Sequence, residues 1–419
     1  MSSRLSVKER SWAFYDWANS AYSVVVVTAI FPLYFKEAAS AAGISASVST
    51  AYWGYANSIS TLFISLLAPI LGTLADFKNF KKRFFFFFAS LGIVFTFLLA
   101  AVPADQWLLL LICFILTSVG YAGANIFYDA FLVDVTDETR MHRVSSYGFA
   151  YGYVGSIIPF LFGIVLILLS QNQVISLTPV MASQAAFAIT ALWWGLFTIP
   201  LIKNVEQVYY AERVPKLITA SFKKLFATIR NIRSYKTLSL FLLAYFFYID
   251  GVNTITVMAT AFGSDLGIGS ADLLMILLVT QIVAAPSAIL FGNLAERYQE
   301  KRMIMAGIGI YIGISVYAYF LDSLLDFWII ALLVGCAQGG VQALSRSYFA
   351  KLIPKEASNE FFGFYNIFGK FAAIIGPLLV GVTAQMTGRT NDGVFSLILL
   401  FIIGVLILMK LPRQERPFS

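Results

Sequence analysis

Twelve long apolar segments constrain this chain more than any other feature. Each has about the 20 residues that an α-helix needs to cross a bilayer, and a helix satisfies the backbone hydrogen bonds that lipid cannot. Charged residues make up only 12% of the chain, against about 25% in soluble domains. The sequence therefore predicts an all-α integral membrane protein. The spanning segments are expected near residues 12–37, 50–75, 84–103, 107–134, 144–170, 181–202, 237–262, 271–295, 303–321, 324–350, 360–386 and 393–411.

A polar stretch at residues 203–236 divides these segments six and six. The division predicts two pseudo-symmetric six-helix bundles, formed by residues 1–202 and 237–419, with the polar stretch as a cytoplasmic linker. Apolar and basic side chains alternate at helical spacing in the linker, which is typical of an amphipathic helix on an anionic membrane surface. A target site for a regulatory protein is the alternative. The residues concerned are Lys216, Leu217, Phe222, Lys223, Lys224, Leu225, Phe226, Ile229 and Arg230.

Lysine and arginine gather on one side of the membrane. The N-terminus, the linker, the C-terminal tail and the loops after the second, fourth, eighth and tenth segments are basic. The opposite loops carry only Lys36 and Arg389. Because basic loops stay in the cytoplasm, we expect a multi-pass protein of the cell membrane with both termini cytoplasmic.

An acid and a carboxamide stand three residues apart in both halves of the chain. Asp16 and Asn19 open the first apolar segment, and Asp250 and Asn253 recur in the seventh. Residues three apart share one face of a helix, and a carboxylate at the membrane centre costs about 2.5–3.5 kcal/mol on insertion scales. The recurrence indicates an internal repeat with a polar site. Alternatively, each aspartate caps the start of its own helix.

A second motif is repeated in the loops after the second and eighth segments. Residues 72–76 and 292–296 both read Gly-x-Leu-Ala-acid, and a basic cluster follows each. This pattern resembles the loop signature of the major facilitator superfamily, whereas a simple positive-inside loop would explain only the basic residues. The acid can dock on a neighbouring helix N-terminus or a basic side chain and hold the halves together on the cytoplasmic side. The expected gate residues here are Asp76, Asp134 (after the fourth segment), Glu296 and Arg297.

Polar residues at helical spacing also mark the fourth and tenth segments. Asn125 and Asp129 are four residues apart, as are Gln338, Gln342 and Arg346, so each set lies on one helix face. The superfamily resemblance implies that these segments line a central cavity. We hypothesise that Arg346 bridges one or more aspartates as a cytoplasmic gate. The alternative is that Asp129 and Arg346 are ordinary anchors in the headgroup region.

Lys370 lies near the middle of the eleventh segment. A lysine at that depth is expensive, so it is expected to face a cavity or a carboxylate. Its role would be to hold a substrate carboxylate or phosphate, or to titrate; a structural salt bridge is the alternative. Asn366 lies one turn earlier on the same face. Gly376 and Pro377 in this segment favour a kink.

The opening motif, Tyr-Asp-Trp-Ala-Asn-Ser-Ala-Tyr at residues 15–22, resembles the hallmark of one branch of the superfamily. This is the vacuole-effluxer-like branch, also called the unknown major facilitator family. The resemblance spans the whole chain and implies the major facilitator fold and a transporter. Fungal members of the branch release amino acids from the vacuole during autophagy, and this compact chain looks like a bacterial member, for which the substrate is poorly defined.

Together these features predict a secondary transporter that works by alternating access. ATP is not expected to drive it directly, because no Gly-x-x-x-x-Gly-Lys-[Ser/Thr] motif is present. Proton coupling through Asp16, Asp129 or Asp250 is the leading hypothesis, with sodium coupling or facilitated diffusion open. A small zwitterionic solute, such as an amino acid or small peptide, is the preferred cargo, with export as the expected direction. Muropeptides, sugars and amphipathic lipids are alternatives. We expect a monomer that contacts membrane lipids, with no cofactor and no nucleic-acid partner.

Two other classes are disfavoured. An intramembrane enzyme needs a nucleophile with a base, or metal ligands, yet the single histidine, His142, lies in a basic loop and no cluster has metal-ligand spacing. A non-transporting sensor is expected to carry a regulatory domain or tail, and only a few residues follow Lys410.

Overall fold

The computed structural model describes residues 4–212, 221–223, 225, 227, 230, 235–265, 268–372 and 374–412. The described part is almost entirely helical, and twelve of its helical stretches are long and apolar enough to span a membrane. This confirms the predicted all-α membrane architecture. The amphipathic helix expected in the linker lies largely outside the described residues, which exclude Lys216, Leu217, Lys224, Phe226 and Ile229.

Contacts divide the chain into two compact units. The first comprises Met1–Ser221 and Lys355–Phe364. It contains α1 (Val7–Tyr22), the π-helical η1 (Ser23–Ala29), α2 (Ile30–Ala41), α3 (Ala46–Ala75), α4 (Phe80–Leu99), α5 (Trp107–Ala130), α6 (Leu132–Val135), α7 (Met141–Gln171) and α8 (Pro179–Asn204). The short η3 (Lys355–Ala357) and the first half of α14 (Ser358–Phe371) also belong to this unit.

The second unit comprises Phe222–Pro354 and Tyr365–Ser419. Its helices are α10 (Lys236–Asp265), α11 (Ser270–Tyr298), α12 (Glu300–Tyr319), α13 (Leu324–Leu352), the second half of α14, α15 (Ile375–Thr387), α16 (Thr390–Ser396) and α17 (Ile398–Met409). The eleventh span is thus made of two helices, α14 and α15, with a break between them.

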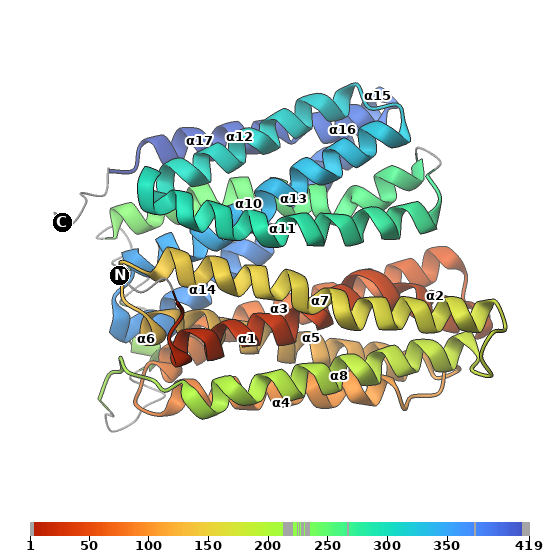
Figure 1. Cartoon of the computed structure of the whole chain (residues 1–419), viewed down its shortest axis with the longest axis horizontal. Helices are drawn as coiled ribbons and strands as arrows, with labels where there is room; N and C mark the ends of the chain where they lie inside the picture. Colours follow the sequence, from red (N-terminus) through yellow and green to blue (C-terminus); the bar gives the residue numbers. More distant parts are fainter. Residues whose placement is uncertain are drawn as a thin grey trace. The chain divides into compact units, whose positions relative to one another are not determined.

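Each unit is a bundle of long helices that run side by side (Figure 1). In the first unit, α1 packs against α7 and α8, and α5 packs against α3 and α4. In the second, α13 packs against α11 and α12, and α10 packs against α17. Buried apolar side chains fill both bundles, while many large apolar residues stay exposed. That distribution suits a protein whose outer surface meets lipid.

The two Gly-x-Leu-Ala-acid loops share one backbone feature and differ in another. Asn79 and Gln299 both have positive φ, 69° and 71°, which is uncommon for residues other than glycine. Each stands seven residues after its motif glycine, since 79 − 72 = 7 and 299 − 292 = 7. Their ψ values differ, 8° at Asn79 and 143° at Gln299. The preceding helix α3 ends at Ala75, whereas α11 continues to Tyr298, so the two loops turn the chain into α4 and α12 differently.

Candidate functional site

The opening motif forms the second half of α1. A capping box between Ser6 and Glu9 starts this helix, so Asp16 does not cap its own helix. Asp16 and Asn19 are 9% and 2% exposed, and both lie within the bundle rather than on its surface. A π-helical turn, η1, follows the motif directly. Such turns occur often at functional sites.

Glycines in α7 bring that helix unusually close to the motif. A Cβ on Gly152 would lie 2.5 Å from Ser20 Oγ and 3.3 Å from the carbonyl oxygen of Asp16. A Cβ on Gly155 would lie 2.5 Å from the carbonyl oxygen of Trp17. Only glycine permits this approach, so α1 and α7 form one tightly packed layer around Asp16.

Predicted polar residues of α1 and α5 meet in the first unit. The Asn19 amide donates to Asn125 Oδ1 at 2.6 Å. Tyr121, one turn before Asn125, lies near both Asp16 and Asp129. Asp129 is partly exposed. The structure therefore gathers Asp16, Asn19, Asn125 and Asp129 around one stretch of α1 and α5.

In the second unit, Asp250 is fully buried on α10 and contacts the break in the eleventh span. Its two carboxylate oxygens accept the backbone N–H of Gly376 at 3.0 and 2.9 Å, and Oδ1 also accepts from the Thr254 hydroxyl at 3.4 Å. Gly376 lies in the first turn of α15, where N–H groups have no partner within the helix. Asp250 thus caps a helix other than its own.

The same contact needs a glycine at residue 376. A Cβ there would collide with Thr254 Oγ1 and would lie 2.7 Å from Asp250 Oδ1. The small residue lets the carboxylate reach the helix end inside the membrane span, where a charge–dipole contact is little screened.

Lys370 stands in the last turn of α14, just before the break. It is partly buried and makes no hydrogen bond or ion pair with the described residues. The negative end of the helix dipole partly offsets the cost of this charge. Asn253 and Gln338, both partly exposed, likewise have no hydrogen-bond partner among the residues that the structure describes. Gln342 and Asn366 are also partly exposed.

The predicted gate acid of the first loop is buried and docked on a helix. Asp76, 1% exposed, accepts the backbone N–H and the side-chain amide of Asn359 through Oδ1, each at 2.9 Å. Asn359 lies in the first turn of α14, and a Cβ on Gly72 would lie 2.5 Å from its carbonyl oxygen. The acid therefore occupies a neighbouring helix N-terminus, one of the two partners that the motif predicts.

A buried ion pair lies beside this dock. Lys81 Nζ lies 2.6 Å from Asp134 Oδ2, and neither side chain is exposed. The ammonium also donates to Ser358 Oγ at 3.0 Å, while Asp134 Oδ1 accepts the backbone N–H groups of Val208 and Tyr209 at 2.8 and 2.9 Å. Both charges are fully engaged, which is the condition under which a buried pair is tolerated.

The second half of the chain carries an equivalent pair with reversed polarity. Glu300, the first residue of α12, lies 3.0 Å from Lys351 Nζ and accepts from Ser347 Oγ at 2.7 Å. Lys351 stands five residues after Arg346 (351 − 346 = 5), and Asp134 stands five residues after Asp129 (134 − 129 = 5). Each half thus joins the start of its third span to the end of its fourth.

The remaining gate candidates fall into two groups. Arg346 is buried, with 3% exposed, and its neighbour Ser345 hydrogen-bonds the Tyr248 hydroxyl at 2.7 Å. Glu296 and Arg297 are exposed, and Arg297 lies over the Tyr298 ring at 5.6 Å. In the second loop, therefore, Glu300 rather than the motif acid is buried.

Sequence reasoning missed Lys81, Glu300 and Glu9 as buried charges. Glu9 accepts from Arg140 Nε at 3.0 Å and from Thr136 Oγ1 at 2.8 Å, which ties the start of α1 to the loop before α7. All three stand in charged runs at span ends, where exposed and buried charges look alike in sequence. For Glu9, the Ser-x-x-Glu capping box was the available sign of a fixed side chain.

Comparison with known proteins agrees with this architecture. The chain matches the family described as "Vacuole effluxer Atg22 like" over residues 7–142 and 133–416. An uncharacterized MFS-type transporter, YxiO of Bacillus subtilis (strain 168), is 58% identical over 414 residues, which cover 99% of this chain and 97% of the relative. Two solved structures have a similar fold, each with a TM-score of 0.72. The human organic anion transporter MFSD10 (TETRAN) is 14% identical and covers 96% of this chain and 99% of its own. The proton:xylose symporter XylE is 11% identical and covers 96% and 95%.

Proposed function

We propose a specific transport function from one premise: the chain belongs to the vacuole effluxer Atg22-like family of major facilitator superfamily transporters. Its relatives are transporters rather than enzymes. The proposal is that the protein exports a small zwitterionic solute, such as an amino acid or small peptide, by proton-coupled alternating access.

Lys370 is the observation that carries the substrate class. It is a lysine inside a membrane span with no ion pair among the described residues, and a lysine at such a position usually faces a partner or a cavity because its charge is costly there. A substrate carboxylate would supply the missing partner. Asn253 and Gln338, in the same unit and with free hydrogen-bonding capacity toward the described residues, supply further polar contacts for such a solute.

The proton coupling in this proposal rests on two aspartates, Asp16 and Asp250. Asp16 is nearly buried in α1 and sits beside the polar contact between Asn19 and Asn125. Asp250 is buried against the N-terminus of α15. A carboxylate in such a place can gain and lose a proton with little water present, and the change of charge alters its contacts. We assign proton coupling to Asp16 first. Export is the proposed direction of transport.

A binding screen tests the proposal. Detergent-purified protein is mixed with amino acids, dipeptides, sugars and muropeptide fragments at acidic and neutral pH, and its melting temperature is measured. A ligand that binds only the folded protein raises this temperature. Stabilisation by amino acids or dipeptides, lost in Lys370→Ala, supports the proposal. Stabilisation by sugars alone would reject it.

Each positive ligand is then tested for movement. The protein is placed in liposomes, and exchange of labelled against unlabelled solute is followed. Exchange of the unmodified solute demonstrates transport, whereas binding without exchange would identify a sensor.

A further inference from the structure

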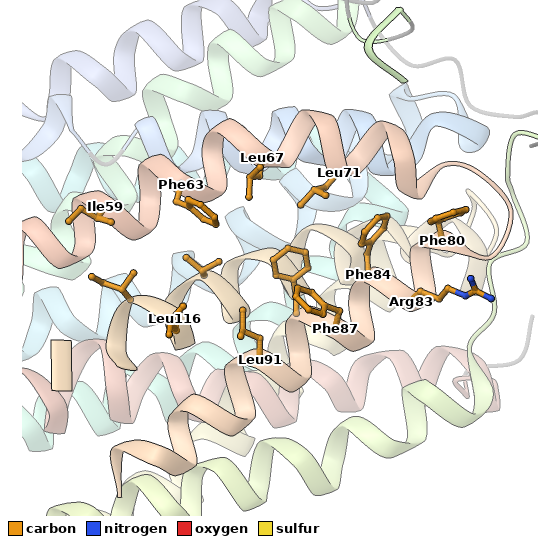
Figure 2. Close-up of a pocket in the computed structure, with 13 residues that line it drawn as sticks. Ile59, Phe63, Leu67, Leu71, Phe80, Arg83, Phe84, Phe87, Leu91 and Leu116 are labelled. Atoms are coloured by element: carbon orange, nitrogen blue, oxygen red, sulfur yellow. The ribbon is translucent and has the colours of Figure 1, made fainter. Parts of the chain in front are cut away.

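An apolar groove runs along the first unit between α3, α4 and α5 (Figure 2). Its volume is about 730 Å³, and every lining residue except Arg83 is apolar. Five phenylalanine rings dominate the lining: Phe63, Phe80, Phe84, Phe87 and Phe88. Four of them come from the start of α4, where five consecutive phenylalanines follow a basic triplet.

The groove is open along its length. Phe63 and Phe87 are 51% and 58% exposed. Both lie on spans long and apolar enough to cross the membrane, so hydrocarbon chains rather than water meet this surface. A groove of this kind is filled by an apolar chain at little cost, because the chain leaves one hydrocarbon environment for another and gains packing contacts.

The length of the groove matches one leaflet. On α3 it extends from Ile59 to Leu71, which is twelve helical steps (71 − 59 = 12) or about 18 Å at a rise of about 1.5 Å per residue. The hydrocarbon core of a bilayer is about 30 Å thick, so one leaflet contributes about 15 Å. An acyl chain of a single leaflet therefore fits the groove from end to end.

Arg83 provides one polar end. Figure 2 shows its guanidinium at the mouth of the groove beside Phe80 and Phe84, at the start of α4. Arg83 is exposed and makes no hydrogen bond or ion pair with the described part of the chain. Lys81, two residues earlier, is buried and bound to Asp134. The two cations thus differ in role, and Arg83 is the one available to an external anion.

We propose that this groove binds one phospholipid, with an acyl chain along α3 and α4 and an anionic headgroup on Arg83. A ligand with one long apolar chain and a single anionic end matches this lining, which is apolar except for one arginine. Guanidinium binds phosphate oxygens through paired N–H donors. The site is separate from the polar residues assigned to transport and does not depend on the proposed substrate.

Native mass spectrometry of the delipidated protein tests this site. The protein is titrated with phosphatidylglycerol or with phosphatidylcholine that has the same acyl chains. We expect tighter binding of phosphatidylglycerol. Arg83→Gln should weaken that binding by about fivefold, the contribution of one basic residue near anionic lipid, and abolish the preference. Arg302→Gln is the matched control, because Arg302 is an exposed arginine at the start of α12, and it should bind as the wild type does.

Leu67→Trp tests the apolar part. Leu67 lies in the middle of the groove, so a larger ring there should reduce binding of both lipids. Leu116→Trp, which fills the groove from α5, replaces it if the first variant does not fold. Equal affinity of the wild type for both lipids, or a preference that survives Arg83→Gln, would overturn the headgroup assignment. Unchanged binding after the groove is filled would show that the lipid sits elsewhere.

Discussion

Asp250 caps the second half of the eleventh span through both of its carboxylate oxygens, which accept the N–H of Gly376 at 3.0 and 2.9 Å. Asp76 caps the first half through Oδ1 alone, which accepts the N–H of Asn359. The two acids come from the two different motifs that recur along the chain. The first backbone N–H groups of a helix have no partner within it, and a carboxylate accepts one of them at the start of α14 and one at the start of α15.

Gly376→Ala should damage this cap. The added methyl group would meet Thr254 Oγ1 and Asp250 Oδ1, so the carboxylate must move away from the helix end. Overpacking of this kind costs about 1–3 kcal/mol, and we expect a lower melting temperature and loss of transport. Gly381→Ala is the matched control in the same helix. Its Cβ meets nothing within 4 Å, so it should stabilise the helix by about 0.5–1 kcal/mol. Equal effects of the two substitutions would show that the cap is unimportant.

Asp16→Asn should separate coupling from binding. The substitution keeps the shape of the side chain and removes its ability to ionise. Accumulation driven by an imposed pH gradient should be lost in liposomes, while exchange of solute across the membrane should persist at least in part. Asp105→Asn, in the exposed loop between α4 and α5, should leave both activities unchanged. Full proton-driven accumulation by the Asp16 variant would remove this residue from the coupling step.

Lys370→Met should distinguish a ligand-binding cation from a structural one. Since Lys370 has no ion pair among the described residues, its replacement by an apolar side chain of similar length should leave the melting temperature unchanged or raise it. The increase in melting temperature caused by amino acids should disappear. Loss of one partner from a buried ion pair costs about 3–5 kcal/mol. If the substitution instead lowers the free energy of unfolding by that amount in the absence of ligand, Lys370 forms a structural salt bridge.

Lys81 and Asp134 should be strongly coupled in a double-mutant cycle. Lys81→Met leaves a buried carboxylate without its cation, at a cost of about 3–5 kcal/mol. Adding Asp134→Asn to Lys81→Met should recover part of the lost stability, because the carboxamide oxygen can still accept the backbone N–H groups of Val208 and Tyr209. Unfolding of the four proteins in detergent gives the coupling free energy, expected at about 1–3 kcal/mol.

The pair of Lys355 with Glu138 provides the comparison for that cycle. Its two side chains are 30% and 56% exposed, so solvent screens their interaction. Lys355→Met should cost less than about 1 kcal/mol. A coupling between Lys81 and Asp134 no larger than this would mean that burial adds nothing to their interaction.

One contact of the candidate site was accessible from sequence, because polar residues stand out inside apolar segments. Asn19 and Asn125 were both selected as polar residues inside apolar segments, and the structure brings them to 2.6 Å. The capping role of Asp250 was not accessible, because its partner Gly376 stands 126 residues later. The alternative in which each aspartate caps its own helix proved wrong, because the two helices begin at Val7 and Lys236, well before Asp16 and Asp250.

The sequence by itself determined the membrane class, the twelve spans and the repeat of two motifs. These properties follow from the free energy of moving about 20 consecutive residues into lipid, which is a local sum. Only the tertiary structure decided which charges are paired. Lys81 and Arg83 are two residues apart in one basic cluster, yet one is buried against Asp134 and the other lines a groove. Which of the two side chains is paired depends on which distant segments pack against each face of α4, and this cannot be predicted from side-chain charge alone.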